Sequence, residues 1–286
     1  MPLIQRLAII GVGLIGGSLA RILRQKGEVA EVVGIGRGEA NLRKAVELGV
    51  IDRYSLDPVA GVEGADLVFL ATPVCSIVDM VARIAPALAP GCVVTDGGSV
   101  KGEIAAPCER LLPPGTFFVG GHPIAGTEKS GVEASFATLY QGKRCILTPT
   151  DKTDAGALAR VARMWELAGS EVVCMDVEKH DRVVAAISHL PHMVAYSLVN
   201  AVSGYDRFSE NILKYSAGGF RDFTRIASSD PAMWRDIALM NREAVLEMMD
   251  FFSAHFATLR NLVDQGDGHG LEAFFFRSKE SRDSIL

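Results

Sequence analysis

The sequence lacks the cysteine patterns that mark disulfide scaffolds and most zinc sites. It contains five cysteines in 286 residues, and none of them belongs to a Cys-x-x-Cys pair. Scattered cysteines are typical of reduced, mostly buried thiols in a cytosolic protein. They are Cys75, Cys92, Cys108, Cys145 and Cys174. The pattern argues against a secreted, disulfide-held protein and suggests no metal site.

A basic excess and a long apolar run are also missing. The formal net charge is −5, and no stretch of like charge stands out, which argues against a nucleic-acid surface. No signal-peptide pattern is visible at the start, and no apolar run reaches membrane-spanning length. With 49% apolar residues, the chain can form a large core in one or two domains. We therefore expect a water-soluble, cytoplasmic protein that binds neither nucleic acid nor a membrane.

What the sequence does contain, close to its start, is a glycine turn between an apolar strand and a helix. Residues 6–10 are predicted to form a buried parallel strand, 19–23 the following helix and 31–35 the next strand. Glycines in such a turn allow a tight bend and a close backbone approach to phosphates, and the helix N-terminus attracts anions. Glycine-rich turns also occur for purely structural reasons, but this context favours a dinucleotide pyrophosphate site. The residues predicted to form it are Gly11, Gly13, Leu14, Ile15 and Gly16.

The end of the second predicted strand bears on the choice of dinucleotide. An acidic residue there would bind the ribose hydroxyls of NAD, but the chain reads Gly36-Arg37-Gly38. A planar guanidinium suits a 2′-phosphate, so Arg37 favours NADP. Glu39 could still serve NAD if the loop folds inward, and a solvent-exposed arginine without a ligand is the other alternative.

Strand and helix patterns continue to alternate as far as residue 176. Further strands are predicted at 66–71, 92–96, 117–120, 145–148 and 171–175, with a helix at 154–168. Thr72, Pro73 and Ser99 follow two of these strands and are expected to line the cofactor crevice. Beyond Asp176 the remainder reads as helices, with an irregular stretch from Ala217 to Asp230. We therefore predict an α/β, Rossmann-type dinucleotide-binding domain over 1–176 and an all-α domain over 177–286.

The helical part ends in a long periodic segment. Asp230 is a good N-cap and Pro231 a good first helical residue, and apolar residues recur at helical spacing as far as Val263. At ~1.5 Å per residue, an unbroken helix of this kind would be about 50 Å long. Such a rod favours packing against a second subunit in a homodimer, and a kinked helix folded on its own domain is the alternative. The tail 266–286 receives no functional interpretation.

Candidate catalytic residues gather after the third of these further strands, in the segment 120–131. His122 follows a predicted strand directly and is flanked by Gly121 and Pro123, so we expect its imidazole in a rigid loop at the nicotinamide edge of the sheet. A lone histidine in a loop is usually structural. Ser99 ends a neighbouring strand, however, and its hydroxyl is placed to orient both the imidazole and a substrate hydroxyl.

Five segments in order then carry a specific resemblance. They are 11–18, 96–101, 122–131, 188–192 and 218–227. Together they resemble the prephenate and arogenate dehydrogenases of tyrosine biosynthesis, over about residues 5–262. The resemblance implies a dinucleotide-binding domain, a helical dimerisation domain and an oxidative decarboxylation, in which hydride passes to the nicotinamide and the ring carboxylate leaves as carbon dioxide.

The family's residue roles fall on matching positions. His122 resembles the histidine that takes the proton of the substrate 4-hydroxyl, Ser99 the serine that shares this contact, and Arg225 the arginine that holds the ring carboxylate. The remaining pocket residues by resemblance are His192 and Trp234, and a charged pair of Glu128 and Asp222. His189 and His192 have a spacing that suggests a metal site, but no carboxylate or thiol completes it.

Two other interpretations of the sequence remain open. A hydroxyacid dehydrogenase of the Rossmann plus helical-domain type would place a catalytic lysine early in the helical domain, where Lys179 lies. A non-catalytic protein that senses nicotinamide nucleotides would need the glycine turn but neither His122 nor Arg225. Within the resemblance, prephenate and arogenate are alternative substrates, and the missing acidic residue at Gly36-Arg37 leaves NAD and NADP as alternative cofactors.

Overall fold

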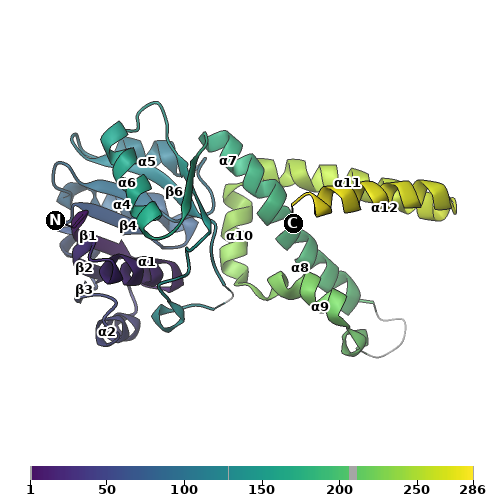
Figure 1. Ribbon diagram of the computed structural model, residues 1–286, viewed down its shortest axis with the longest axis horizontal. Helices are drawn as coiled ribbons and strands as arrows, with labels where there is room; N and C mark the ends of the chain where they lie inside the picture. The colour runs from purple at the N-terminus through teal and green to yellow at the C-terminus, as the bar shows by residue number, and fades with distance from the viewer. Residues whose placement is uncertain (1, 128, 206–210, 286) are drawn as a thin grey trace. The chain divides into compact units, whose positions relative to one another are not determined.

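The computed structural model describes residues 2–127, 129–205 and 211–285. Its N-terminal part contains an eight-stranded sheet in the order β3-β2-β1-β4-β5-β6-β7-β8 (Figure 1). The strands are β1 (Ile4–Ile10), β2 (Val29–Ile35), β3 (Arg53–Ser55), β4 (Leu67–Leu70), β5 (Val93–Asp96), β6 (Phe117–Pro123), β7 (Arg144–Thr148) and β8 (Glu171–Cys174). Neighbouring strands are parallel, except that β6 and β7 are antiparallel. The strand order reverses at β1 and β4, where open α/β sheets bind ligands.

Helices cover both faces of this sheet. One core layer is formed with α1 (Leu14–Gln25), α2 (Glu39–Glu47) and α6 (Ala155–Leu167). The opposite layer is formed with α3 (Pro58–Val62), α4 (Ile77–Ile84) and α5 (Ala105–Leu111). Asp57 and Asp154 cap α3 and α6 by accepting a backbone N–H, which fixes where these helices start. The predicted α/β class with a Rossmann-type first part is confirmed.

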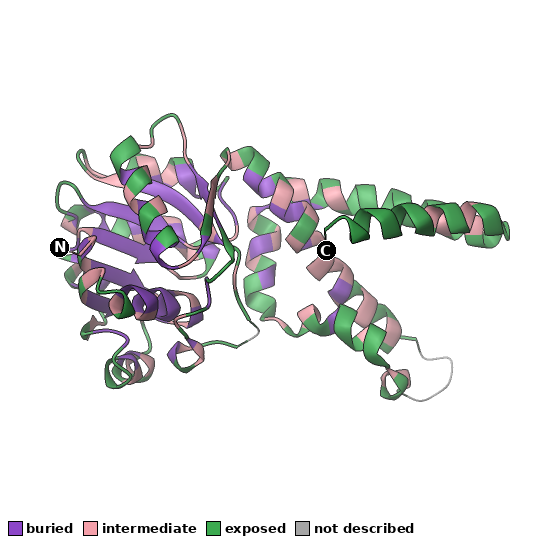
Figure 2. Cartoon of the chain, viewed as in Figure 1, coloured by how far each residue is buried: buried purple, intermediate pink, exposed green. Residues whose placement is uncertain are grey.

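The central strands are buried on both faces, as Figure 2 shows in purple. A parallel strand covered by helices on each side reads as a continuous apolar run, which is why Leu67–Leu70 could be recognised from sequence. Phe69 on β4 packs edge-to-face on Trp165 of α6 at a centroid distance of 5.6 Å, and Tyr140 packs on the same ring at 5.1 Å. These contacts anchor α6 to the middle of the sheet.

After β8, the described residues form helices and no further strand. They are α7 (Val177–Val184), a π-helical turn (Ala185–His189), α8 (Leu190–Ser203), α9 (Gly218–Thr224), α10 (Pro231–Met240), α11 (Arg242–Asp264) and α12 (Gly268–Asp283), with short 3₁₀ turns between some of them. The expectation of irregular structure over 217–230 is wrong, because α9 and the 3₁₀ turn Arg225–Ser228 occupy most of it. Hydrogen bonds such as Thr224 Oγ1 to the Phe220 carbonyl, 2.6 Å, support this short helix despite its two glycines.

The predicted single helix over 230–263 is also wrong. Asp230 caps α10 as expected, but Asn241 leaves the helical conformation at φ −108° and ψ 36°, and α11 begins one residue later. The Asn241 side chain is buried and donates to the Asp181 carbonyl over 2.8 Å. A side chain held in this way competes with the regular helix. The 23 residues of α11 correspond to about 35 Å, at ~1.5 Å per residue.

The chain divides into two compact units, residues 1–241 and 242–286. In the second unit α11 and α12 pack on each other, and Asp267 caps α12 by accepting the Gly270 N–H over 2.9 Å. Both helices expose most of their surface (Figure 2). The sequence-based boundary at residue 176 stays a prediction.

One helical stretch, Val177–Ser203, is long and apolar enough to span a membrane by length and composition. From the sequence, no apolar run of this length was expected. This is weak evidence for a span, because the core helices of water-soluble proteins pass the same test.

Candidate active site

A cavity of about 710 Å³ opens at the carboxyl ends of β1, β2 and β4. The predicted cofactor residues Gly11, Gly13, Arg37, Thr72 and Pro73 all line it. Leu14, Ile15 and Gly16 instead form the first turn of α1, directly behind this lining, and Ser99 lies in the bend after β5. The cavity therefore has the position that the glycine turn predicts for a dinucleotide.

The backbone of the turn explains two of its glycines. Gly11 has φ +97°, and a Cβ there would lie 2.5 Å from the Ala71 carbonyl oxygen. A Cβ on Gly16 would lie 2.4 Å from the Gly11 carbonyl oxygen. Real Cβ atoms do not approach this closely, so both positions require glycine for packing alone.

Gly13, the third glycine considered, has open space where a side chain would begin, and a bound anion needs such space. A Cβ on Gly13 would meet no atom within 4 Å. Gly13 precedes α1, whose first turn has no acidic residue and no side-chain cap. The first N–H groups of a helix have no partner within the helix and attract anions. The residues present therefore fit a dinucleotide pyrophosphate.

Asn41 of α2 holds the rim of this cavity and was missed by the sequence analysis. Its Nδ2 donates to the Val12 carbonyl over 2.7 Å, and its Oδ1 accepts the Val132 N–H over 3.1 Å. The side chain thus ties the glycine turn to the segment that follows His122. An asparagine inside a helical pattern gives no sequence signal for such a contact.

The cavity wall at the end of β2 is formed by Gly36, Arg37 and Gly38. Glu39 does not line the cavity. Its carboxylate accepts from Arg43, at 2.8 Å, and from the Tyr54 hydroxyl, also at 2.8 Å. The Glu39 carboxylate is therefore engaged outside the cavity lining. Arg37 is exposed and is the residue at this wall that carries a full positive charge.

Cys75 lines the cavity on its far side and connects it to the helical segment. Its Sγ donates to Asp236 of α10 over 3.0 Å, and this carboxylate raises the pKa of the thiol. The three buried thiols differ from it. Burial raises the pKa of Cys92 and of Cys108 to about 12, and Cys145 is raised further.

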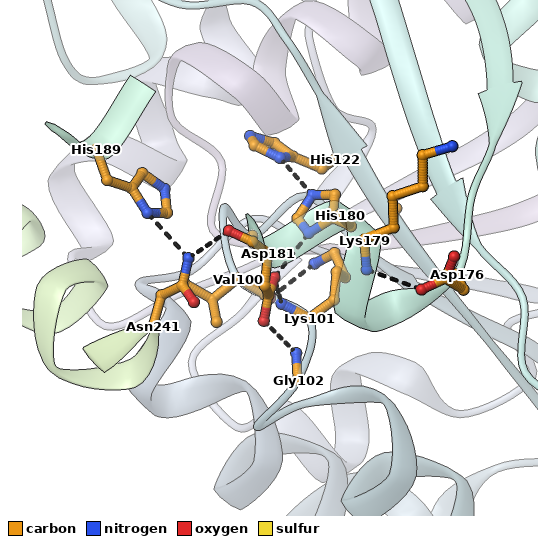
Figure 3. Close-up of polar contacts among 12 residues, drawn as sticks. Val100, Lys101, Gly102, His122, Asp176, Lys179, His180, Asp181, His189 and Asn241 are labelled. Carbon is orange, nitrogen blue, oxygen red and sulfur yellow. Dashed lines mark hydrogen bonds and ion pairs between the residues drawn. The ribbon is translucent and has the colours of Figure 1, made fainter. Parts of the chain in front are cut away.

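His122 lies within β6 opposite Ile146 of β7, and not in a loop as expected. Pro123, which was expected to hold His122 in a loop, is the last residue of this strand. The ring is partly buried, and its Nδ1 lies 2.9 Å from Nε2 of His180 (Figure 3). Burial, together with His180 and the Lys101 cation, lowers the pKa of His122 well below its usual value. The imidazole is therefore neutral near pH 7, the state that a general base needs.

Ser99 is partly buried in the bend that follows β5. Within residues 2–127, 129–205 and 211–285, its hydroxyl has no hydrogen-bond partner, so the expected contact with His122 is not formed. The contact of His122 is to His180 instead, which the sequence analysis did not select.

Behind His122, a second histidine and an aspartate complete a chain of hydrogen bonds (Figure 3). His180 is fully buried, and its Nδ1 lies 2.7 Å from Oδ1 of Asp181. Asp181 also accepts the backbone N–H groups of Lys101, at 2.9 Å, and Gly102, at 2.7 Å. Burial alone would raise the pKa of Asp181, but the hydrogen bonds from His180 and these two backbone groups hold it below its usual value.

A buried ion pair lies beneath this chain. Lys101 and Asp96 have no exposed surface, and Lys101 Nζ pairs with Asp96 Oδ2. Asp96 also accepts the N–H groups of Gly98, at 2.9 Å, and Gly121, at 3.1 Å. The pair therefore joins the end of β5 to the residue before His122.

His192 and Trp234 come together as the resemblance implied. Their rings stack at a centroid distance of 3.5 Å, and His192 Nδ1 lies 2.8 Å from the Ser188 carbonyl. His189 lies edge-on to the same indole, and its Nδ1 is 3.1 Å from Asn241 Nδ2. Burial lowers the pKa of His189 to about 4. The described residues contain no group of three or more side chains that could hold a metal ion.

Arg225 begins the 3₁₀ turn after α9, and this turn packs on α8, which carries His192. The positive charge of Arg225 contributes to lowering the pKa of His192, after the larger effect of burial and against the Ser188 hydrogen bond. Asp222 lies on α9 and is exposed. Glu128, its expected partner, lies outside the described residues.

Lys179, which a hydroxyacid dehydrogenase would use, is not part of the hydrogen-bonded group of His122, His180 and Asp181. Its backbone N–H donates to Asp176 over 2.8 Å at the start of α7, and its side chain is exposed. Figure 3 shows this side chain directed away from His122, whereas the next residue, His180, faces it.

Comparison with known proteins matches both parts of the chain to one family. Residues 19–174 match the model "Prephenate dehydrogenase, nucleotide-binding domain", and residues 176–276 match "Prephenate dehydrogenase, dimerization domain". A cyclohexadienyl dehydrogenase from Zymomonas mobilis is 40% identical over 283 residues, covering 99% of this chain and 96% of that enzyme. A prephenate dehydrogenase from Bacillus subtilis is 37% identical, covering 97% of this chain and 75% of that enzyme.

A solved structure of similar length agrees with these relatives. It is a prephenate dehydrogenase from Aquifex aeolicus in complex with hydroxyphenyl propionate and NAD⁺, with a TM-score of 0.94 and 42% identity. The match covers 99% of this chain and 98% of that one. The two-part fold and the nicotinamide cofactor predicted from sequence are thereby supported.

Proposed function

This chain belongs to the prephenate dehydrogenase family, and we propose that it oxidatively decarboxylates prephenate to 4-hydroxyphenylpyruvate, arogenate to tyrosine, or both, in tyrosine biosynthesis. The observation that carries the proposal is the neutral, partly buried imidazole of His122, which stands on the strand after the cofactor-binding half of the sheet. Gly11, Gly13 and Arg37 line the cavity that would hold the nicotinamide cofactor, which would supply the acceptor for the hydride from the ring carbon that bears the 4-hydroxyl.

The protein's own contribution begins at that hydroxyl. His122 accepts its proton as the ring carbonyl forms, which a neutral imidazole can do near pH 7. The free hydroxyl of Ser99 donates to the same oxygen and orients it. The bond to the ring carboxylate then breaks, its electron pair enters the ring and carbon dioxide leaves. The oxygen of the now aromatic ring takes the proton back from His122 as the product hydroxyl.

Substrate binding is assigned to the helical segments. Arg225 holds the ring carboxylate with a planar, bidentate cation. The stacked pair of His192 and Trp234 lines the side-chain end of the pocket. Asp222 and Glu128 are assigned to the pocket as two acidic residues, on the basis of the resemblance; Glu128 lies outside the described residues.

We assign NADP as the preferred cofactor. Arg37 lines the cavity at the end of β2, and Glu39, the carboxylate two positions after it, is held by Arg43 and Tyr54. A guanidinium recognises a 2′-phosphate, whereas a carboxylate recognises the ribose hydroxyls of NAD.

The assembly is proposed to be a cytoplasmic homodimer formed through residues 177–286, with 1–176 as the dinucleotide-binding domain. The match to a dimerization domain supports this, as do apolar side chains left exposed on α11 and α12. These include Phe251, Phe256, Phe275 and Phe276. No nucleic acid or membrane is assigned as a partner.

The experiment that tests the function is a matrix of substrates and cofactors. Prephenate, arogenate and a simple hydroxyacid are each incubated with NAD and NADP, and reduced nicotinamide and released carbon dioxide are measured. We expect equal amounts of both products with prephenate or arogenate, and neither with the hydroxyacid. Turnover of the hydroxyacid that Lys179→Ala abolishes would establish the hydroxyacid dehydrogenase instead, and cofactor binding without any turnover would establish a sensing protein.

A further inference from the structure

His122 is the last of three side chains linked by hydrogen bonds, Asp181, His180 and His122. In both hydrogen bonds the donor and the acceptor can be assigned. We propose that Asp181 and His180 are positioning residues that fix the tautomer of His122, with hydrogen on Nδ1 and the lone pair on Nε2. This inference rests on the proposed function of His122 as the base. It concerns two residues that no sequence motif selected and that do not touch the substrate.

The direction is set at Asp181. Its carboxylate accepts two backbone N–H groups, from Lys101 and Gly102, and is held in its ionised form. An ionised carboxylate offers only lone pairs. His180 Nδ1, at 2.7 Å from this carboxylate, must therefore carry a hydrogen and donate it.

The tautomer of His180 in turn determines the tautomer of His122. A neutral imidazole that donates from Nδ1 has its lone pair on Nε2. His180 Nε2 lies 2.9 Å from Nδ1 of His122, so Nδ1 of His122 is the donor in that contact. The lone pair of His122 is then on Nε2, the nitrogen that faces away from His180 and is free to accept the substrate proton.

The reverse tautomer would disable the site. With hydrogen on Nε2 of His180, the lone pair of His122 would be on Nδ1 and would be spent on His180. Nε2 of His122 would then present a hydrogen to the substrate hydroxyl, and no base would be available. His122 would also be a poor base without a nearby negative charge, because its imidazolium form would not be stabilised after it accepts the proton.

The surroundings of His122 show why a negative charge is needed. The charged or titratable groups near it are Lys101, His180, His189 and Cys145, with Asp96 paired to Lys101. Lys101 and the two histidines all disfavour the imidazolium. Asp181, acting through His180, favours it. In the reaction the hydroxyl proton moves to Nε2 of His122. The hydrogens on Nδ1 of His180 and Nδ1 of His122 stay in place.

A matched pair of substitutions at His180 tests the hydrogen bonds that link Asp181 to His122. His180→Gln keeps an amide that donates to Asp181 and offers its oxygen to His122 Nδ1, whereas His180→Met has a similar shape and no polar hydrogen-bonding amide. We expect kcat of His180→Gln to stay within about tenfold of the parent, and kcat of His180→Met to fall by roughly 10²-fold, with KM nearly unchanged in both. Asp181→Asn, which removes the negative charge, should lower the pKa of His122 and move the acid limb of the kcat profile to lower pH.

A readout independent of activity separates this proposal from the proposed function. In protein labelled with ¹⁵N-histidine, the His122 signals are identified by their loss in His122→Asn. We expect Nδ1 protonated and Nε2 unprotonated in the parent and in His180→Gln, and a changed tautomer distribution in His180→Met.

A parent with hydrogen on His122 Nε2, or a His180→Met variant with unchanged tautomer and kcat, overturns the proposal. If His122→Asn keeps its activity, the base assignment is wrong even where the tautomers are as described.

Discussion

The buried pair of Lys101 and Asp96 allows a prediction in which stability and catalysis change together. Lys101→Met leaves the Asp96 carboxylate without its partner at a position with no exposed surface. Breaking a buried ion pair by removing one partner costs about 3–5 kcal/mol. At roughly 2–4 °C for each kcal/mol, the melting temperature should fall by about 6–20 °C.

The same substitution should change the pH dependence of turnover. The Lys101 cation contributes to the lowered pKa of His122, so its removal raises that pKa while burial and His180 continue to lower it. A base with a raised pKa becomes protonated at a higher pH, and the acid limb of the kcat profile should therefore move to higher pH. The reaction is followed by reduced nicotinamide absorbance across the range in which the variant stays folded.

The control is the double variant Lys101→Met with Asp96→Asn, in which no charge is left unpaired. Its stability, measured by urea unfolding with tryptophan fluorescence, should recover most of the loss, although Asn accepts less well from Gly98 and Gly121. Its acid limb should stay at higher pH than that of the parent, because the Lys101 cation that lowers the pKa of His122 is still absent. A Lys101→Met variant that loses less than about 1 kcal/mol, or whose acid limb stays in place, contradicts the reasoning.

Three further predictions concern the assigned site. His122→Asn should lower kcat by ~10²–10⁴ with cofactor affinity nearly unchanged; cofactor titration by fluorescence provides the control, and a variant that keeps most of its kcat would remove His122 from the mechanism. Arg37→Ala should weaken NADP binding by roughly 1.5–3 kcal/mol, the range for hydrogen bonds to charged groups, with little effect on NAD; equal losses by calorimetry, or a parent that strongly prefers NAD, would contradict the 2′-phosphate assignment. Arg225→Lys should raise KM at least tenfold with a smaller fall in kcat, because the carboxylate contact exists in the ground state as well; an analogue without the ring carboxylate should bind parent and variant alike, and an equal loss for it would make Arg225 a structural residue.

The central strands could be predicted because they are buried on both faces and appear as continuous apolar runs. Sequence patterns did not predict two other features, strand β3 and the helix break at Asn241. Strand β3 has three residues at the sheet edge, too few to show a period. The helix break at Asn241 was missed because its cause is not local: the side chain is drawn out of the helix pattern by the carbonyl of Asp181, 60 positions away.

The candidate site shows the same division between local and distant causes. The glycine turn is a local backbone requirement, so Gly11 and Gly16 could be interpreted from sequence. His180 could not, because its role comes from a contact across 58 positions with His122 and from complete burial. A His-Asp doublet early in a helix has no distinctive periodicity. His122 itself was found, but the strand before it was predicted to end at Gly120, with Gly121 and Pro123 holding His122 in a loop. The antiparallel β7 instead extends the pairing through His122 and Pro123.

The distribution of thiols has a practical consequence for labelling chemistry. Cys92, Cys108 and Cys145 are buried with raised pKa values, whereas Cys75 and Cys174 are exposed. Thiolates on accessible side chains attack maleimide reagents, and the hydrogen bond to Asp236 disfavours the thiolate of Cys75. A fluorophore can therefore be attached at Cys174, at the end of β8, without first removing the three buried cysteines. Replacing Cys75 then leaves a single accessible attachment point for spectroscopy.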